Sequence, residues 1–217
     1  MRIIVLNAIL VLSVLKCLAQ SVEKKDFLYS HRISVVFGLI QPMVLKGGNV
    51  EVNYTTKRMI FDYSHGFSLD PPSAGAYKDE NVVLHLPYST GFGIGYRLNS
   101  FLDIRIEPKL HSWEVYYKDE VQSKSNKLKD YKTFTLGAGL YYRYFPFRNS
   151  KLKGLQGITT AASLRYWPKI GTTLSKDRFI YDNKFFGKTI TQKAANIGMA
   201  NTPFIINVSV GYTFGGK

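Results

Sequence analysis

The chain has 217 residues, a size that fits a single domain once an N-terminal targeting segment is set aside. Its only cysteine, Cys17, lies in that segment, so the remaining chain has no disulfide. The formal net charge of +14 at pH 7 favours an anionic partner surface, or lysines that only keep external loops soluble. Export of the chain argues against nucleic acid as that partner and for anionic lipid headgroups or lipopolysaccharide phosphates.

Residues 1–19 have the pattern of a secretory signal peptide: a positive start, an apolar middle and small residues before the predicted cleavage at Gln20. The apolar stretch is shorter than the roughly 20 residues that a spanning helix needs. Lys16 occupies a position where lipoprotein processing at Cys17 requires a small residue. We therefore predict a signal peptide at 1–19 and one mature domain at 20–217.

Period-two alternation of apolar with small or polar residues predicts eight strands in the mature chain. A rival threading continues the second strand through Asp62 and moves its turn to about Gly66. The long segment before the last strand is also a candidate for an additional hairpin around Phe179–Ile190. In chain order, the predicted strands are Arg32–Leu45, Asn49–Tyr54, Met59–Leu69, Leu86–Leu98, Phe101–Tyr117, Tyr131–Pro146, Leu155–Trp167 and Pro203–Phe214.

The polar faces of these strands are rich in glycine, threonine and serine, whereas the solvated face of a soluble sandwich would carry more lysine and glutamate. Several segments approach the 9–11 residues that a tilted transmembrane strand needs. Strands in lipid must close on themselves, since no water satisfies a free edge. The fold class predicted is thus all-β: a closed, antiparallel, up-and-down transmembrane β-barrel of about eight strands, with its apolar rows outward. Aromatic residues at segment ends are predicted to form interfacial girdles, the alternative being a soluble core; they are Tyr96, Tyr142, Tyr144, Phe145, Phe147, Tyr166, Trp167, Tyr212 and Phe214.

The connections alternate between short and long. Short turns are predicted at 55–58, near 97–101 and at 147–154, and barrels of this type keep their short turns on the periplasmic side. An even number of strands then places both termini on that side. Long polar stretches are predicted to face outward, at Asp70–Leu84, Lys118–Asp130 and Lys169–Thr202; the second of these begins a basic run of Lys124, Lys127, Lys129 and Lys132.

The last strand ends Val210-Gly211-Tyr212-Thr213-Phe214, which is similar to the C-terminal assembly signal of small bacterial outer-membrane barrels. Val210, Tyr212 and Phe214 carry this resemblance, although Gly215-Gly216-Lys217 follow where the family ends on the aromatic. Over the whole mature chain the pattern resembles the OmpA, OmpX and OmpW type. The resemblance implies an outer-membrane location in a Gram-negative envelope, recognition by the barrel-assembly machinery, and a monomer. It permits an OmpX-like plugged lumen or an OmpW-like carrier of small hydrophobic molecules.

On this threading four acidic and five basic side chains point into the lumen. Opposite charges packed together offset the cost of burying each one, and eight strands leave an interior just wide enough for side chains. We therefore predict a salt-bridge network that plugs the barrel, with a narrow polar conduit or small-ligand site as the alternative. The residues are Glu51, Asp62, Arg97, Asp103, Arg105, Glu107, Lys109, Arg143 and Arg165.

The segment Tyr63–Ser68 is the one stretch that resembles an enzyme site. Lipid A deacylases and outer-membrane phospholipases are barrels whose serine is paired with histidine in a His-x-Ser-Asn pattern. Here Phe67 stands two positions after His65, while Ser64 and Ser68 lie on the opposite face of a straight strand. His31, His85 and His111 are scattered, without the spacing of metal ligands. No catalytic residue, cofactor or metal is predicted.

These observations predict a monomeric, non-enzymatic outer-membrane barrel with a structural or surface-binding role. Its expected partners are outer-membrane lipid and lipopolysaccharide. One alternative function is a narrow channel or carrier for small solutes or hydrophobic molecules. The other is a lipid A or phospholipid acyl hydrolase.

Overall fold

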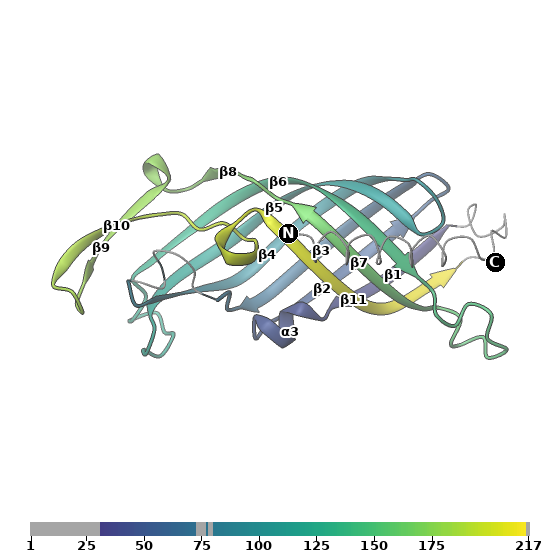
Figure 1. Cartoon of the computed structure of the whole chain (residues 1–217), viewed down its shortest axis with the longest axis horizontal. Coiled ribbons are helices and arrows are strands. Elements are labelled where there is room, and N and C mark those ends of the chain that lie inside the picture. The colour runs from purple at the N-terminus through teal and green to yellow at the C-terminus, as the bar shows by residue number, and fades with distance from the viewer. Residues whose placement is uncertain (1–30, 73–76, 78–79, 216–217) are drawn as a thin grey trace, which may run out of the picture.

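The computed structural model describes residues 31–72, 77 and 80–215, so the predicted signal peptide lies outside the described residues. Eight antiparallel strands form a closed barrel, in which each strand pairs with its neighbour in the chain, β11 pairs with β1 and β5 pairs with β6 (Figure 1). This confirms the predicted fold class and strand number. The strands are β1 (Arg32–Gly38), β2 (Gly48–Thr55), β3 (Met59–Leu69), β4 (Val82–Arg97), β5 (Leu102–Tyr117), β6 (Lys129–Tyr144), β7 (Ile158–Tyr166) and β11 (Phe204–Gly215).

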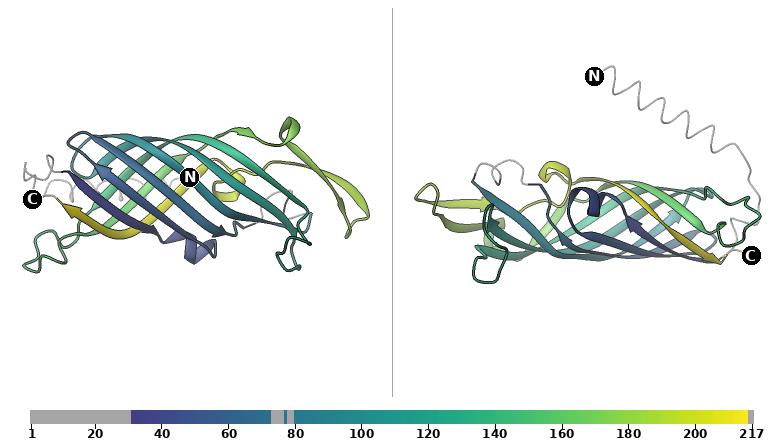
Figure 2. Two further views of the ribbon diagram at one scale, coloured as in Figure 1. Left: turned by 180° about the vertical axis from the view of Figure 1, so that it is seen from behind. Right: turned by 90° about the horizontal axis from the view of Figure 1, so that it is seen from below.

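The two ends of the barrel differ, as both views in Figure 2 show. At the turn end lie the connections 56–58, 98–101 and 145–157, together with the paired strand ends Arg32 and Gly215. At the loop end lie the other connections, including the longest of all, which joins β7 to β11. The 145–157 connection is longer than the other loop-end connections, so the turn predicted at 147–154 is not a short one. Gly66 pairs with Asn49 and Ser89 within continuous ladders, so the rival threading with a turn at Gly66 is wrong. The short turns predicted at 55–58 and 97–101 are confirmed.

Two predicted strand boundaries are wrong by four residues or more. The first strand ends at Gly38 rather than Leu45, and a short helix, α3 (Ile40–Val44), follows it. Pro42 lacks the N–H that a ladder needs, although the apolar alternation runs on past it. The fourth strand begins at Val82 rather than Leu86, and its register shifts between His85 and Ser89, around Pro87. A bulge at this proline lets the strand continue toward the loop end.

The connection from β7 to β11 has its own structure. β8 (Lys169–Thr172) pairs with β6 beyond the end of β7. Both β7 and β8 thus pair with β6, one after the other, and Trp167 and Pro168 lie between them. After the 3₁₀ turn η1 (Ser175–Asp177), strands β9 (Arg178–Asn183) and β10 (Lys188–Lys193) form the predicted additional hairpin. This hairpin projects beyond the barrel at the loop end (Figure 1). A second 3₁₀ turn, η2 (Met199–Asn201), leads into β11.

Burial on the barrel strands is inverted relative to a soluble protein, with large apolar side chains outside and charged side chains inside. Within the described residues, no helix is long and apolar enough to cross a membrane. The girdle prediction is wrong for two aromatic residues, Phe145 and Trp167, which are buried inside the barrel. The outward row includes Ile33, Phe37, Phe92, Ile94, Ile106, Leu136, Leu140, Leu164, Phe204, Ile206 and Val208.

The interior has two layers, and only the polar one was predicted. Along β5 the inward side chains change from charged residues at 103–109 to Trp113 and Val115 toward the loop end. An apolar cluster fills the barrel there and extends to the hairpin, whose inner face packs on it. The cluster comprises Leu69, Tyr77, Val82, Leu84, Leu86, Trp113, Val115, Tyr117, Tyr131, Phe179, Tyr181, Ile190, Ala194 and Ala195.

Polar contacts hold the hairpin over this cluster. Tyr117 donates a hydrogen bond to the Asp182 carbonyl at 2.7 Å. Tyr77 donates to the Lys193 carbonyl, and burial raises the pKa of the Tyr77 phenol, which keeps it protonated as a donor. Lys169 forms an ion pair with Asp177 at 2.6 Å, next to the start of the hairpin. These contacts fix the hairpin as a cap on the loop end.

Candidate functional site

The structure places all nine predicted lumenal residues inside the barrel, where each is buried. They come from six neighbouring strands, β2 to β7, because every second side chain of a strand points inward. Seven of them form a connected network, while two lie apart at the turn end. The network contains Glu51, Asp62, Asp103, Arg105, Glu107, Lys109 and Arg165; the separate pair is Arg97 and Arg143.

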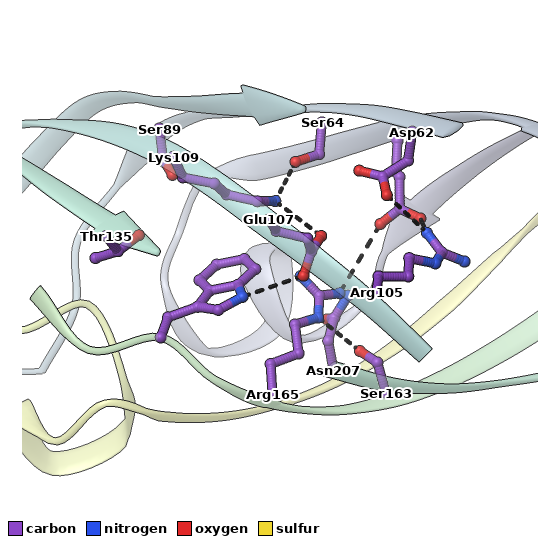
Figure 3. A network of polar contacts seen from close by, with 12 residues as sticks. Asp62, Ser64, Ser89, Arg105, Glu107, Lys109, Thr135, Ser163, Arg165 and Asn207 are labelled. Carbon is purple, nitrogen blue, oxygen red and sulfur yellow. Dashed lines mark hydrogen bonds and ion pairs between the residues drawn. The ribbon is translucent and has the colours of Figure 1, made fainter. Parts of the chain in front are cut away.

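Arg105 is the centre of the network. Its Nε donates to Asp103 Oδ1 at 2.6 Å, and its Nη1 donates to Glu51 Oε1 at 2.8 Å. Nη1 also lies 3.3 Å from Asp62 Oδ2 (Figure 3). One guanidinium therefore bridges three carboxylates. Such charge-assisted bonds are the strong ones, and the planar fork of arginine serves several acceptors at once.

Small neighbours make room for the Arg105 side chain. In the ladder, Gly95 of β4 and Gly139 of β6 stand directly opposite Arg105 on either side. A Cβ atom at Gly95 would come within 2.7 Å of Arg105 Cγ. On its remaining face, the guanidinium lies 3.8 Å from the centre of the Tyr141 ring. The glycine-rich polar face of β4 therefore has a local purpose, which is to accommodate a long inward side chain.

A second centre lies at Glu107, one inward position further along β5. Lys109 Nζ lies 3.6 Å from Glu107 Oε1 and donates to Ser64 Oγ. Trp167 Nε1 donates to Glu107 Oε2 at 3.1 Å, and Tyr141 donates to the same oxygen. Charged and aromatic side chains thus fill the middle of the lumen together.

Arg165 joins the two centres. Its Nη2 lies 3.9 Å from Glu51 Oε2, and its Nε donates to Ser163 Oγ at 2.8 Å. The guanidinium also lies 5.0 Å from the ring centres of Tyr141 and Trp167. The network therefore spans the lumen from β2 to β7.

Gly137 determines where the Trp167 indole lies. A Cβ atom at Gly137 would overlap Trp167 Cδ1, so the ring occupies the space that this glycine leaves open. We predict that Gly137→Ala lowers the free energy of unfolding by about 1–3 kcal/mol, since it overpacks the lumen and moves Trp167 away from Glu107. Thermal unfolding of the detergent-folded barrel measures this. Gly154→Ala is the matched control, because no atom lies within 4 Å of its added methyl group; equal stability of the two variants would contradict the prediction.

The turn end of the lumen holds arginines away from the network. Arg97 Nη1 donates to the Thr56 carbonyl at 2.8 Å, and Arg143 Nη1 donates to Thr55 Oγ1 at 3.3 Å. Sequence reasoning missed Arg32, which is also buried there and pairs across the ladder with Thr55. Arg32 lies two residues before Ser34, which points inward, so the period of two could have predicted its inward position.

The predicted enzyme-like stretch does not assemble a serine–histidine pair. Ser64 points inward and accepts a hydrogen bond from Lys109, whereas His65 lies on the other face beside Phe67, with ring centres 6.5 Å apart. A different histidine contacts hydroxyl groups inside the barrel. His111 Nδ1 lies 2.7 Å from Ser89 Oγ and Nε2 lies 3.0 Å from Thr135 Oγ1.

Among residues 31–72, 77 and 80–215, no three histidine, cysteine or acidic side chains are grouped as metal ligands would be. The C-terminal residues of the predicted assembly signal lie on β11, with Val210 and Phe214 exposed on its outer face and Tyr212 partly exposed.

No protein-family model matches the chain, and no curated protein sequence matches it. The solved structures that are similar to it include three proteins of the outer membrane or cell surface. One is Ail, the attachment invasion locus protein of Yersinia pestis, in complex with the heparin analogue sucrose octasulfate, with 14% identity, a TM-score of 0.40, and coverage of 85% of this chain and 99% of that one. Another is a major outer membrane protein from Thermus thermophilus, with 10% identity, a TM-score of 0.46, and coverage of 86% and 98%. The third is Neisserial surface protein A, with 12% identity, a TM-score of 0.30, and coverage of 86% and 93%. The chain is an eight-stranded β-barrel that is similar to these surface and outer-membrane proteins.

Proposed function

We propose that the chain is an integral outer-membrane barrel that is sealed along its axis and acts through its outer surface. The observation that carries this proposal is the inversion of burial: leucine, isoleucine and phenylalanine side chains cover the outside of the strands, while arginine, lysine and carboxylate side chains fill the inside. A water-soluble chain would gain free energy from the opposite arrangement. In a bilayer, hydrocarbon covers the apolar outer face while the charged side chains pair inside. A closed barrel also leaves no unpaired strand edge in the lipid.

The two interior layers support a sealed lumen. Toward the turn end and the middle, the ion network centred on Arg105 and Glu107 occupies the lumen. Toward the loop end, the apolar cluster fills the space above it, and the hairpin covers that cluster. An ion crossing the barrel would have to displace both layers, so we infer that the protein does not conduct.

The loop end supports the surface-binding role. Many of its exposed basic side chains come from the 118–128 connection, the adjoining end of β6, and the hairpin region. We propose that they bind the phosphates of lipopolysaccharide, whose charge is complementary to theirs. These residues are Lys118, Lys124, Lys129, Lys132, Lys176 and Lys188. No catalytic step is part of the proposal, since Ser64 and His65 lie on opposite faces of β3.

Planar-bilayer recording tests the seal. Purified protein whose folding has been verified by heat-dependent gel migration is expected to give no defined single-channel steps. Reproducible steps of one size would overturn the sealed lumen and favour the alternative of a narrow channel.

A charge-reversal comparison tests the surface. The loop-end variant Lys124→Glu, Lys129→Glu, Lys132→Glu is expected to lose most binding to vesicles that contain lipopolysaccharide, and the remaining binding should depend less on salt. The matched control reverses Lys151 and Lys153, which are exposed at the turn end. If both variants bind as the unmodified protein does, the proposed surface is wrong. Acyl release from lipid A, measured in the same samples, is expected to be absent; its presence would favour the hydrolase alternative.

A further inference from the structure

Among the described residues, the buried basic and acidic side chains inside the barrel are unequal in number. In the part of the chain that the structure describes, the buried cations are Arg32, Arg97, Arg105, Lys109, Arg143 and Arg165, whereas the buried anions are Glu51, Asp62, Asp103 and Glu107. Among these described residues, buried basic side chains outnumber buried acidic ones by two. All four acids contact Arg105, Lys109 or Arg165. Arg32, Arg97 and Arg143 lie on the turn-end side of the network.

Arg143 is one of these buried basic side chains. It is 8% exposed, and within the described residues it forms no ion pair. Its Nη1 donates to Thr55 Oγ1, but its buried Nε has no hydrogen-bond partner. Burying a guanidinium without an ion-pair partner is unfavourable, so an additional anion at this position would stabilise the barrel.

A second donor without a partner lines the same space. Asn53 Oδ1 accepts a hydrogen bond from Arg105 at 2.7 Å, which fixes the orientation of this amide. Its Nδ2 is buried and has no partner. Asn53 and Arg143 both line a small cavity between the ion network and the wall formed by β7 and β11. Two unsatisfied N–H donors on one cavity favour a ligand that only accepts hydrogen bonds.

The other walls of the cavity supply further donors. Ser163 Oγ accepts from Arg165 Nε at 2.8 Å, and Ser209 Oγ accepts from Asn207 Nδ2 at 3.0 Å. Each hydroxyl group keeps its own proton to donate. Glu51 is the one acid at the cavity, and its two oxygens face Arg105 and Arg165. The space open to the centre of a water-sized particle is about 10 Å³, so the cavity holds one particle at least as large as water.

We propose that this cavity binds one small monovalent anion of the size of chloride or bromide, through Arg143 Nε and Asn53 Nδ2. A water molecule in the same place would accept these hydrogen bonds but would leave Arg143 without an ion pair. Arg32 and Arg97 lie on the turn-end side, so an anion that enters from that end meets positive charge before it reaches the cavity. The proposal does not depend on the surface-binding role.

Diffraction from crystals of the unmodified protein grown in bromide tests the site directly. An anomalous difference peak is expected within hydrogen-bond distance of both Arg143 Nε and Asn53 Nδ2. Density for a water without an anomalous peak, or an empty cavity, would overturn the proposal. Because no substitution is involved, the result does not depend on whether a variant folds.

A solution experiment tests the same site. The melting temperature in detergent is expected to be higher in chloride than in gluconate at equal ionic strength, because gluconate is too large for the cavity. Arg143→Gln is expected to remove this difference, whereas Arg148→Gln, which changes a half-buried arginine of the 145–157 connection outside the cavity, is expected to keep it. Equal melting temperatures in the two salts for the unmodified protein would contradict a bound halide.

Discussion

Replacing Arg105 with alanine is expected to lower the free energy of unfolding by about 3–5 kcal/mol, because the change leaves buried carboxylates without their counter-charge. Asp103 and Asp62 have Arg105 as their one ion-pair partner among the described residues. Glu51 keeps only the longer contact of 3.9 Å to Arg165. Truncation also removes the side chain that packs against the Tyr141 ring and leaves a cavity in its place.

Thermal unfolding in detergent, followed by circular dichroism and heat-dependent gel migration, measures this loss. Arg58→Ala is the matched control, since Arg58 is an exposed arginine in the 56–58 turn, and its removal should change stability by no more than about 0.5 kcal/mol. Arg105→Lys is expected to fall between the two, because an ammonium group keeps the charge but cannot bridge three carboxylates with a planar fork. An unchanged melting temperature for Arg105→Ala would indicate a water-filled lumen instead of a paired network.

The sequence was sufficient for the barrel and for the inward position of the ionic side chains, because both depend on the period of two within single strands. Asp103, Arg105, Glu107 and Lys109 alternate with outward apolar residues on one strand, so the inward set can be predicted without any knowledge of the neighbouring strands. The same argument would have placed Phe145 and Trp167 correctly, since they share the parity of Arg143 and Arg165. Their aromatic character favoured the membrane interface, and the period was the more reliable signal.

The arrangement within the lumen depends on register, which a single strand does not contain. That Arg105 stands between Gly95 and Gly139 follows from pairings across three strands. Whether Arg143 meets a carboxylate likewise depends on contacts between β6 and β2. The apolar upper layer was missed for a different reason, since Trp113 and Val115 continue the inward face of a strand that is otherwise charged, and their partners in β9 and β10 are distant in the sequence.

Placing one charge at the middle of the outer wall is expected to separate a membrane barrel from a soluble one. Leu136 lies in the centre of β6 and points outward with 45% of its surface exposed, while Val121 lies in the 118–128 connection and is 78% exposed. In water, an arginine at either position would reach solvent, and both substitutions would be nearly neutral. In a bilayer, Leu136→Arg moves a guanidinium into hydrocarbon and is expected to destabilise the folded protein by about 2–4 kcal/mol, the cost found near the midplane of such barrels.

Val121→Arg is therefore the control for the same chemical change at a more exposed apolar residue. Folding into phospholipid vesicles, titrated with denaturant, measures the difference between the two variants directly. A deficit confined to Leu136→Arg places hydrocarbon against the apolar rows of β6, because an arginine at an outward position that is 45% exposed would otherwise reach water. Equal stability of the two variants in vesicles would mean that water, and not lipid, covers the strands, and the ionic side chains inside the barrel would then need another explanation.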